Sequence, residues 1–300
     1  MNFLYCFDNN FNLQALNSIM SIIKNNKNQK IKIYVIHDDP ASFQKIIDKY
    51  LNDYEEVFEI FEFDFNFVNF PKLNKSHVSK ATYFRLFFQK YIPEHIDFIT
   101  YVDSDIICIS NFYSELNEKI NEIKSEKLLL GAVTESTGGD NKKRLGLMND
   151  NYFNAGVMIL NMVEWKNKIT IEAIINKINL LGDKIIWWDQ DVLNSLIDGN
   201  YLSIEDRFNK QTTFIENSPD KDEIFIHYSG KGKPWSVSFY KDNINSVYQK
   251  YFKNTNITMY HLEISKFTDY LIFFKNLLFG NYKKYGNKEI FISTIKIKKI

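Results

Sequence analysis

Two aspartates separated by one residue give the clearest chemical signal in the sequence. Asp103 and Asp105 lie in the stretch 98–107, whose β-branched and aromatic residues predict a buried strand that delivers acids to a sheet edge. Residues i and i+2 of an extended chain point the same way, so both carboxylates can face one divalent cation. Mg²⁺ and Mn²⁺ prefer oxygen ligands and bridge to phosphates, which predicts a metal-bound nucleoside diphosphate. In the alternative interpretation, both aspartates only cap backbone amides in a turn.

A second polar group follows the first apolar segment, 3–7. Asp8 and Asn10 can hydrogen-bond the edge of a nucleobase while the ring of Phe11 stacks on its face. This mode needs no glycine-rich loop, and neither a G-x-G-x-x-G nor a G-x-x-x-x-G-K follows this segment. Dinucleotide-binding and P-loop folds are therefore disfavoured. An Asn/Asp turn that leads into a helix is the alternative.

Arg85 falls within an aromatic segment, 75–91, that predicts a helix beginning near Ser76 and ending before Pro93. The apolar positions of this helix are Tyr83, Leu86, Phe87 and Tyr91, with Phe84 and Phe88 near the edge. The Arg85 side chain either snorkels from this face to solvent or, beside two aspartates and a sugar, orients carboxylates and hydroxyls.

Further candidates come from later segments. The segment 134–151 is rich in Gly, Asp, Asn and Lys and predicts a long loop that covers the site. Asn154 and Gly156 then precede an apolar strand, where small residues permit close approach of the backbone to a ligand, although a bulge would also explain them. Asp189 is expected to cap the next helix, and Gln190 to point into the cavity.

A histidine and a lysine complete the candidate set. His227 ends the predicted strand 223–227 and is followed by a glycine-spaced turn with Gly230 and Lys233. Such a turn can wrap a phosphate oxygen that a metal also binds. In the simpler alternative, His227 is a surface or hydrogen-bonded residue.

The elements that must position these residues alternate between strand and helix. Strands are predicted at 3–7, 31–36, 57–63 and 128–133, and helices at 13–23, at 42–51 and from 112 onward. A βαβαβ order predicts a mainly parallel sheet with helices on both faces and ligands at the carboxyl ends of its strands. Asp8, Asn10 and Asp103 are then expected on one rim.

Composition allows one large α/β domain or two small ones, because 300 residues with 45% hydrophobic content can bury a large core. The net charge of zero argues against nucleic acid as a partner, but the charge is unevenly distributed. Residues 264–300 contain eight Lys against Asp269 and Glu289, a balance of +6, so residues 1–263 carry −6.

The two cysteines and the N-terminal residues indicate the cellular compartment of the protein. Cys6 and Cys108 lie in apolar runs and are expected to be free thiols in a reducing compartment. No signal-peptide pattern precedes the first strand, and no apolar run reaches the roughly 18 residues of a membrane span. We therefore expect a cytoplasmic protein.

Five motifs in order resemble those of glycosyltransferase family 8 and, among its members, bacterial retaining galactosyl- and glucosyltransferases of lipooligosaccharide synthesis. They are the acid and amide after the first strand, the helix arginine, D-x-D, the N-A-G strand with D-Q-D-V-L-N, and H-x-x-G-x-x-K-P-W. The resemblance implies a GT-A fold, a Rossmann-like α/β catalytic domain over 1–240. Its nucleotide-sugar half is expected at about 1–110 and its sugar and acceptor half at about 111–240, followed by a helical, basic segment over 241–300.

The resemblance also implies roles for single residues. The expected Mn²⁺ ligands, with Mg²⁺ as the alternative cation, are Asp103, Asp105 and His227. The expected nucleotide contacts are Cys6, Asp8, Asn10, Phe11, Asp103, Ser104, Gly230 and Lys233. The expected sugar contacts are Arg85, Asn154, Gly156, Asp189 and Gln190, of which Asp189 and Gln190 are the candidate catalytic residues.

The implied reaction is the retaining transfer of galactose or glucose from a UDP-sugar to a saccharide acceptor. Gln190 carries an amide, a poor nucleophile, so we favour a same-face substitution in which Asp189 orients sugar hydroxyls and Gln190 steadies the cationic centre. A metal-dependent sugar-nucleotide hydrolase or nucleotidyltransferase and a catalytically silent sugar-binding protein are the alternatives. A catalytically silent relative would be recognised by the loss of a metal ligand, and all three candidate ligands are present.

The C-terminal segment predicts an amphipathic helix over 267–278. Its large residues Phe267, Tyr270, Leu271, Phe274, Leu277 and Leu278 recur at three-and-four spacing, and lysines flank and follow them. The helix either packs on the domain with a solvated basic end or lies on a membrane surface as a monotopic anchor. The second interpretation predicts peripheral association with the inner face of the cell membrane through 264–300, and a lipid-linked acceptor.

Overall fold

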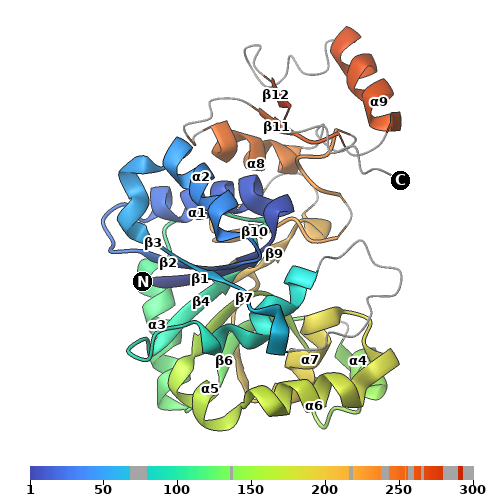
Figure 1. Cartoon of the computed structure of the whole chain (residues 1–300). Coiled ribbons are helices and arrows are strands. Elements are labelled where there is room, and N and C mark those ends of the chain that lie inside the picture. The colour runs from blue at the N-terminus through green and yellow to red at the C-terminus, as the bar shows by residue number, and fades with distance from the viewer. Residues whose placement is uncertain are drawn as a thin grey trace.

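A seven-stranded mixed sheet forms the centre of the protein in the computed structural model (Figure 1). The structure describes residues 1–67, 80–135, 138–215, 219–230, 232–237, 243–253, 255, 260–264, 267–279 and 290–292. In spatial order the strands are β3 (Phe58–Glu62), β2 (Lys32–His37), β1 (Asn2–Phe7), β4 (Phe98–Val102), β7 (Phe153–Asn161), β6 (Leu130–Thr134) and β8 (Tyr201–Ser203). Only β7 runs antiparallel to its neighbours β4 and β6 in this sheet, which confirms the mainly parallel sheet predicted from the sequence.

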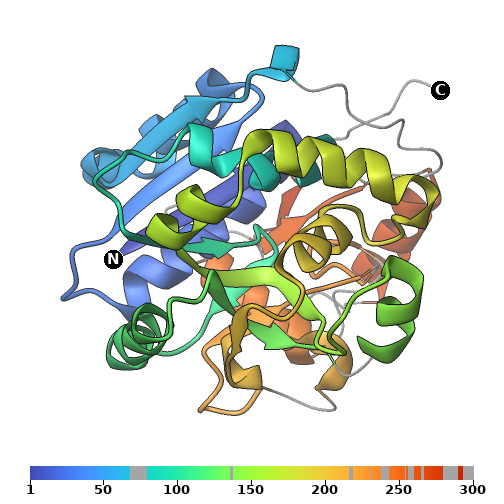
Figure 2. The same ribbon diagram turned by 90° about the horizontal axis from the view of Figure 1, so that it is seen from below.

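Helices cover both faces of this sheet, as expected. On one face lie α1 (Asn12–Asn25), α2 (Pro40–Tyr50), α3 (Tyr113–Ser125) and α8 (Asn243–Lys253). On the other lie a 3₁₀ segment (Lys80–Lys90), α5 (Met162–Lys168), α6 (Ile171–Leu181) and α7 (Trp188–Ile197), the side seen in Figure 2. The side chains of β1 alternate between the two hydrophobic cores, with Phe3 and Tyr5 in the first and Leu4 in the second.

A small second sheet brings the histidine to the aspartates. It contains β5 (Ile106–Cys108), β10 (Phe225–His227) and β9 (Lys210–Gln211), with β10 between the other two. The antiparallel register of β10 and β5 places His227 opposite Ile106. The strand predicted over 98–107 is confirmed for Phe98–Val102 (β4) but does not continue through the aspartates. β5 belongs to the other sheet, and a turn separates the two strands, in which the Ile106 N–H donates to the Asp103 carbonyl (3.2 Å).

Two further local predictions need correction. The predicted loop 134–151 contains a helix, α4 (Gly138–Leu145), with Asp140 in its first turn and Arg144 in its last, the arrangement that suits the helix dipole. The aromatic segment around Arg85 is 3₁₀ and not α-helical, and Phe84 and Phe88 are buried like its other aromatic residues. The predicted helix start near Ser76 lies outside the described residues.

The C-terminal elements pack beyond α8, at the top of Figure 1. They are the parallel strands β11 (Tyr260–Leu262) and β12 (Ile290–Ile292), and α9 (Phe267–Leu278), whose bounds match the predicted helix. Phe273 of α9 packs on a small hydrophobic cluster with Leu262, whereas Phe267 and Leu271 are 80% and 61% exposed. Among the helices that the structure describes, none is long and apolar enough to cross a membrane.

Candidate active site

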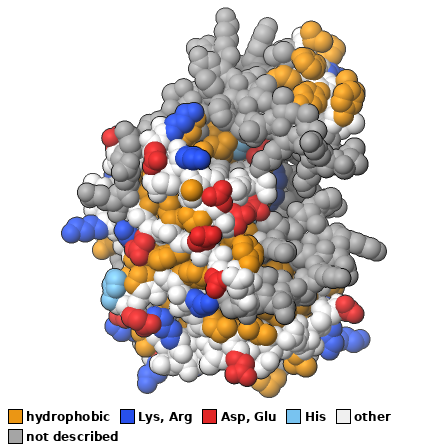
Figure 3. Space-filling view, viewed as in Figure 1, with side chains coloured by type: hydrophobic (Ala, Val, Ile, Leu, Met, Phe, Trp, Pro, Cys, Tyr) orange, Lys and Arg blue, Asp and Glu red, His pale blue; other side chains and the backbone are white. Residues whose placement is uncertain are grey.

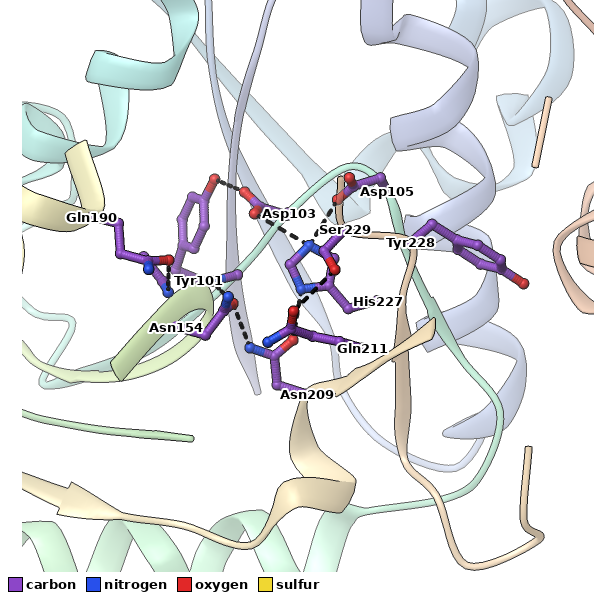
Figure 4. Close-up of polar contacts among 12 residues, drawn as sticks. Tyr101, Asp103, Asp105, Asn154, Gln190, Asn209, Gln211, His227, Tyr228 and Ser229 are labelled. Carbon is purple, nitrogen blue, oxygen red and sulfur yellow. Dashed lines mark hydrogen bonds and ion pairs between the residues drawn. The ribbon is translucent and has the colours of Figure 1, made fainter. Parts of the chain in front are cut away.

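Asp103, Asp105 and His227 come together at the junction of the two sheets (Figure 4). One ligand atom from each residue lies within 4.8 Å of the others, and His227 Nε2 is 3.5 Å from Asp105 Oδ1 and 3.9 Å from Asp103 Oδ2. Two carboxylates and an imidazole form a donor set that suits Mn²⁺ and other divalent metals. The three residues expected to bind a metal therefore lie close enough together to share one ion.

Lys233 contacts this group through Asp105. Its ammonium donates to Asp105 Oδ2 (2.5 Å) and to the Tyr228 carbonyl (2.7 Å). Burial opposes ionisation of Asp105, but Lys233 and His227 outweigh it and hold the pKa of that carboxyl well below its usual range. The carboxylate is therefore charged and available to a cation at neutral pH.

Arg85 links Asp103 to Asp189. Its Nη2 is 2.9 Å from Asp103 Oδ1, its Nε is 2.9 Å from Asp189 Oδ2, and its Nη1 donates to the Ala155 carbonyl (3.0 Å). The guanidinium also stacks over the Tyr101 ring at 4.6 Å. With only 11% of its side chain exposed, Arg85 does not snorkel to solvent; it holds two carboxylates from distant parts of the chain.

Asp189 does not cap its helix, contrary to the prediction. α7 begins at Trp188, so Asp189 lies in the first turn, where its side chain is buried. Burial raises the pKa of Asp189 to about 7, against the opposing effect of Arg85. The backbone N–H groups of Ile186 and Trp187 instead donate to Asp191 (2.7 and 2.8 Å).

Gln190 and Asn154 meet at a glutamate that the sequence analysis missed. Glu135 Oε1 accepts from Asn154 Nδ2 (2.7 Å) and lies 3.5 Å from Gln190 Nε2, while Gln190 Oε1 accepts from the Ala155 N–H (3.0 Å). Glu135 directly follows β6, as Asp103 follows β4. An acid at the end of a predicted strand is the signal that could have identified it.

Gly156 lies against the imidazole of His227. A Cβ atom at this position would stand 2.5 Å from His227 Cε1, so only glycine lets β7 pass this close. Gly156 therefore makes room for His227, a candidate metal ligand. The sequence had instead predicted that this glycine allows the backbone to approach a substrate. Asn209, also missed by the sequence analysis, contacts both His227 and Asn154.

The predicted nucleotide contacts lie mostly at the carboxyl end of β1 and near the aspartate turn. Asp8 is buried, and its carboxylate accepts the backbone N–H (2.9 Å) and the side-chain amide (3.2 Å) of Asn10. Phe11 packs edge-on against Trp235, with ring centroids 6.3 Å apart. The half-buried Cys6 lies beside Asp8 at the end of the same strand.

Two more of these residues offer groups to a ligand. The buried hydroxyl of Ser104 has no hydrogen-bond partner within the described part of the chain. Gly230 has φ +78°, a left-handed conformation that favours glycine, and is exposed. Since β1 and β4 are parallel neighbours, Asp8 and Asp103 share one rim of the sheet, as predicted.

Comparison with known proteins identifies the family. The model of glycosyl transferase family 8 matches residues 2–238. The chain belongs to this family. It is 28% identical over 271 residues to a lipopolysaccharide 1,2-glucosyltransferase of Escherichia coli (82% of this chain, 75% of the relative). It is 27% identical over 257 residues to a lipopolysaccharide 1,3-galactosyltransferase of Salmonella typhimurium (78% of this chain, 72% of the relative).

A solved structure confirms the expected GT-A fold of this family 8 glycosyltransferase. Galactosyltransferase LgtC in complex with donor and acceptor sugar analogues superimposes with a TM-score of 0.72. The match has 22% sequence identity and covers 85% of this chain and 96% of LgtC.

An ion pair that sequence analysis missed fixes the start of α7 in this family 8 chain. Both oxygens of Asp191 bind the Arg144 guanidinium (2.7 and 2.8 Å), and Asp191 Oδ1 also accepts from the Tyr152 hydroxyl (2.7 Å). The Asp191 side chain is fully buried. The pair ties α4 to the turn that carries Asp189 and Gln190.

The pKa of Asp189 predicts a pH dependence for the transferase. Below pH 7 the carboxyl becomes protonated, and Arg85 then loses one of its two anionic partners. At saturating metal, kcat/KM of the wild type is expected to fall about tenfold per pH unit below the pKa, whereas Asp189→Asn should show a low activity without this inflection. A wild-type profile that stays flat between about pH 5 and pH 8 would contradict this assignment.

Proposed function

We propose that the protein is a retaining hexosyltransferase that moves galactose or glucose from UDP-galactose or UDP-glucose to a saccharide acceptor of a surface glycan such as lipooligosaccharide. One observation carries this proposal. Asp103 belongs both to the group that can hold a divalent cation and to the Arg85–Asp189 ion-pair cluster. A diphosphate held by the cation would therefore place its attached sugar beside Arg85 and Asp189.

The residues on either side fit a UDP-sugar. On the nucleoside side, Cys6, Asp8, Asn10 and Phe11 lie at and just after the end of β1. The buried Ser104 hydroxyl in the aspartate turn has no partner among the residues that the structure describes. On the phosphate side, the Lys233 ammonium lies next to Asp105. Gly230, three residues after the end of β10, is exposed. Amide, aromatic and cationic groups of the kinds that bind a base, a sugar and a diphosphate support this proposal.

The proposed cation is Mn²⁺, and Mg²⁺ is the alternative. Asp103, Asp105 and His227 would hold it, and when bound it would supply positive charge to the leaving UDP. Lys233 adds a second positive charge beside the same phosphates. Arg85 and Asp189 hold sugar hydroxyls in place, with Asn154 and Gly156 on the facing strand.

Retention of configuration is proposed to follow from a same-face substitution. The Gln190 amide is a poor nucleophile, and its oxygen already accepts from Ala155. Both oxygens of the buried Asp191 are occupied by Arg144, Tyr152 and backbone N–H groups. A second carboxylate for double displacement is therefore not offered by either residue. Asp189 orients the sugar and Gln190 steadies the cationic centre while the acceptor enters from the side on which UDP leaves.

A donor panel tests this proposal. UDP-galactose, UDP-glucose and the corresponding UDP-N-acetyl sugars are each incubated with Mn²⁺ and a saccharide acceptor, and UDP release is measured with and without acceptor. We expect acceptor-stimulated release from one of the two UDP-hexoses. The absence of acceptor-stimulated release from every UDP-sugar would overturn the proposal.

Peripheral membrane association through 264–300 is proposed from α9. Phe274 is 55% and Leu278 is 85% exposed, at helical spacing from the exposed Phe267 and Leu271. Figure 3 shows hydrophobic surface over α9, at the upper right. The sequence of this segment carries a balance of +6. The apolar side chains would enter the membrane–water interface, and each lysine near an anionic leaflet would add about 1 kcal/mol of binding free energy. This binding would hold the enzyme over a lipid-linked acceptor on the cytoplasmic face.

Vesicle co-sedimentation tests the role of α9. The wild type is expected to sediment with anionic vesicles more than with neutral ones, and the double variant Leu271→Glu/Phe274→Glu is expected to lose most of this binding because it places charges on the apolar stripe. Leu180→Glu, at a 75% exposed position of α6, is the matched control and should bind as the wild type does. Equal sedimentation of all three proteins would contradict an anchor at α9.

A further inference from the structure

We infer that Asn209 is a positioning residue that determines which nitrogen of His227 faces the metal-binding aspartates and that connects this imidazole to the sugar-binding side of the site. The inference rests on the proposed function. Asn209 precedes β9, is 1% exposed, and lies between His227 and Asn154 (Figure 4). Its position 55 residues from Asn154 in sequence explains why no local motif contains it.

The direction of each hydrogen bond follows from one backbone group. The Gly156 N–H can only donate, and it lies 2.9 Å from Asn154 Oδ1, which fixes the orientation of the Asn154 amide. The same oxygen is 2.7 Å from Asn209 and cannot donate, so Asn209 must present its Nδ2 there. Asn209 Oδ1 then faces His227 Nδ1 at 2.8 Å. Because an amide oxygen only accepts, Nδ1 of His227 carries the hydrogen.

The tautomer of His227 suits a metal ligand. A neutral imidazole with a hydrogen on Nδ1 has its lone pair on Nε2, the nitrogen that faces Asp105 and Asp103. Metal-binding histidines commonly donate their second N–H to an oxygen acceptor, which fixes both ring orientation and tautomer. The other side of the ring is closed by Gly156, since a Cβ there would lie 2.7 Å from Nδ1.

The same hydrogen bonds continue toward the sugar. Asn154 uses its remaining Nδ2 to donate to Glu135 Oε1 (2.7 Å), which also lies near Gln190. A continuous chain therefore runs from His227 through Asn209 and Asn154 to Glu135. Three of its four members, His227, Asn209 and Asn154, are buried, so water does not readily replace a lost partner. Asn209 thus supports the metal-binding side and the sugar-binding side at once.

Two substitutions separate these two effects. In Asn209→Asp, one oxygen still accepts from His227 Nδ1, but the other faces Asn154 Oδ1 without a hydrogen between them, so only the link to Asn154 breaks. In Asn209→Leu, a side chain of similar size removes both links. We expect Mn²⁺ affinity, measured by electron paramagnetic resonance without substrate, to stay near the wild-type value in Asn209→Asp and to fall about 10- to 100-fold in Asn209→Leu. Both variants should lower kcat at saturating Mn²⁺ by at least about tenfold.

Asn161→Leu is the matched control. Asn161 is a buried asparagine at the far end of β7 that caps α5, so its loss should lower thermal stability and leave Mn²⁺ affinity unchanged. If Asn209→Leu behaves like this control, Asn209 only fills the core and the inference is wrong. Loss of Mn²⁺ binding by Asn209→Asp equal to that by Asn209→Leu would overturn the tautomer assignment.

The wild type provides a readout that needs neither a variant nor activity. Nitrogen-15 spectra of histidine-labelled protein distinguish the two tautomers, and the signals of His227 are those missing from His227→Gln. A hydrogen on Nδ1 is expected, and a hydrogen on Nε2 would overturn the inference. If the wild type binds Mn²⁺ but transfers no hexose, the proposed function fails while the spectra and the metal affinities still test Asn209.

Discussion

Replacing Asp105 with asparagine is expected to lower hexosyl transfer on the order of 10²-fold or more while the protein stays folded. Asp105 lies in a turn, and its carboxylate contributes charge to the group with Asp103 and His227, not volume to a hydrophobic core. Asparagine keeps the size and loses the charge that attracts a cation and pairs with Lys233. Initial rates at several Mn²⁺ concentrations, with thermal melting in parallel, give the measurement. Asp103→Asn should lose activity to a similar extent.

Glu94→Gln serves as the control for removal of one carboxylate. Glu94 is 92% exposed and pairs only at the surface with Lys166, so this variant should keep wild-type activity. Chelation of divalent cations by EDTA should lower wild-type activity by at least as much as Asp105→Asn. Transfer at the full rate in EDTA, or by Asp105→Asn, would show that the carboxylates do not bind an essential metal.

Arg85→Met is expected to have the largest effect on stability. It leaves Asp103 and Asp189 without the cation that both contact at 2.9 Å, and removing one partner of a buried ion pair typically costs about 3–5 kcal/mol in free energy of unfolding. Arg85→Lys should lose less stability but most of the activity, because a single ammonium cannot match the forked contacts to two carboxylates and a carbonyl. Denaturant unfolding and initial rates measure the two effects.

The double variant Arg85→Met/Asp189→Asn isolates the ion pair. It should be more stable than Arg85→Met alone, since one uncompensated buried charge is gone. The deficit of Arg85→Met should also shrink as the pH falls toward about 7, because loss of the guanidinium raises the pKa of Asp189 further and the folded variant then binds this proton before the folded wild type does. A deficit of Arg85→Met that is independent of both pH and residue 189 would mean that Arg85 stabilises the fold through packing only.

The sheet and its rim were predictable because their signals are local. Strand β1 and its neighbours are short apolar runs punctuated by polar residues, and the order of strands and helices determines which strand ends lie together. Asp8 and Asp103 could therefore be placed on one rim from sequence alone. The helix over Phe267–Leu278 was likewise found from the spacing of its large residues.

The contacts that complete the site were not predictable, because they join residues far apart in the chain. Arg85 could be assigned to solvent or to a carboxylate, and only the fold brings Asp189 to it. Asp189 has the residue type of a helix cap, but it lies in the first turn of α7 and does not cap the helix. The N–H groups just before the helix donate to Asp191, which Arg144 also binds. Asn209 belongs to no motif, and its role depends on strands from three parts of the sequence meeting at His227.

The products of a single reaction test the central claim most directly. The wild type is incubated with Mn²⁺, its preferred UDP-hexose and a saccharide acceptor, and the mixture is followed by proton nuclear magnetic resonance. A retaining hexosyltransferase is predicted to form UDP and an α-linked product in equal amounts, because the donor is an α-linked UDP-hexose. Free hexose in place of the linked product, UMP with a sugar phosphate, or a β-linked product would contradict the proposed reaction.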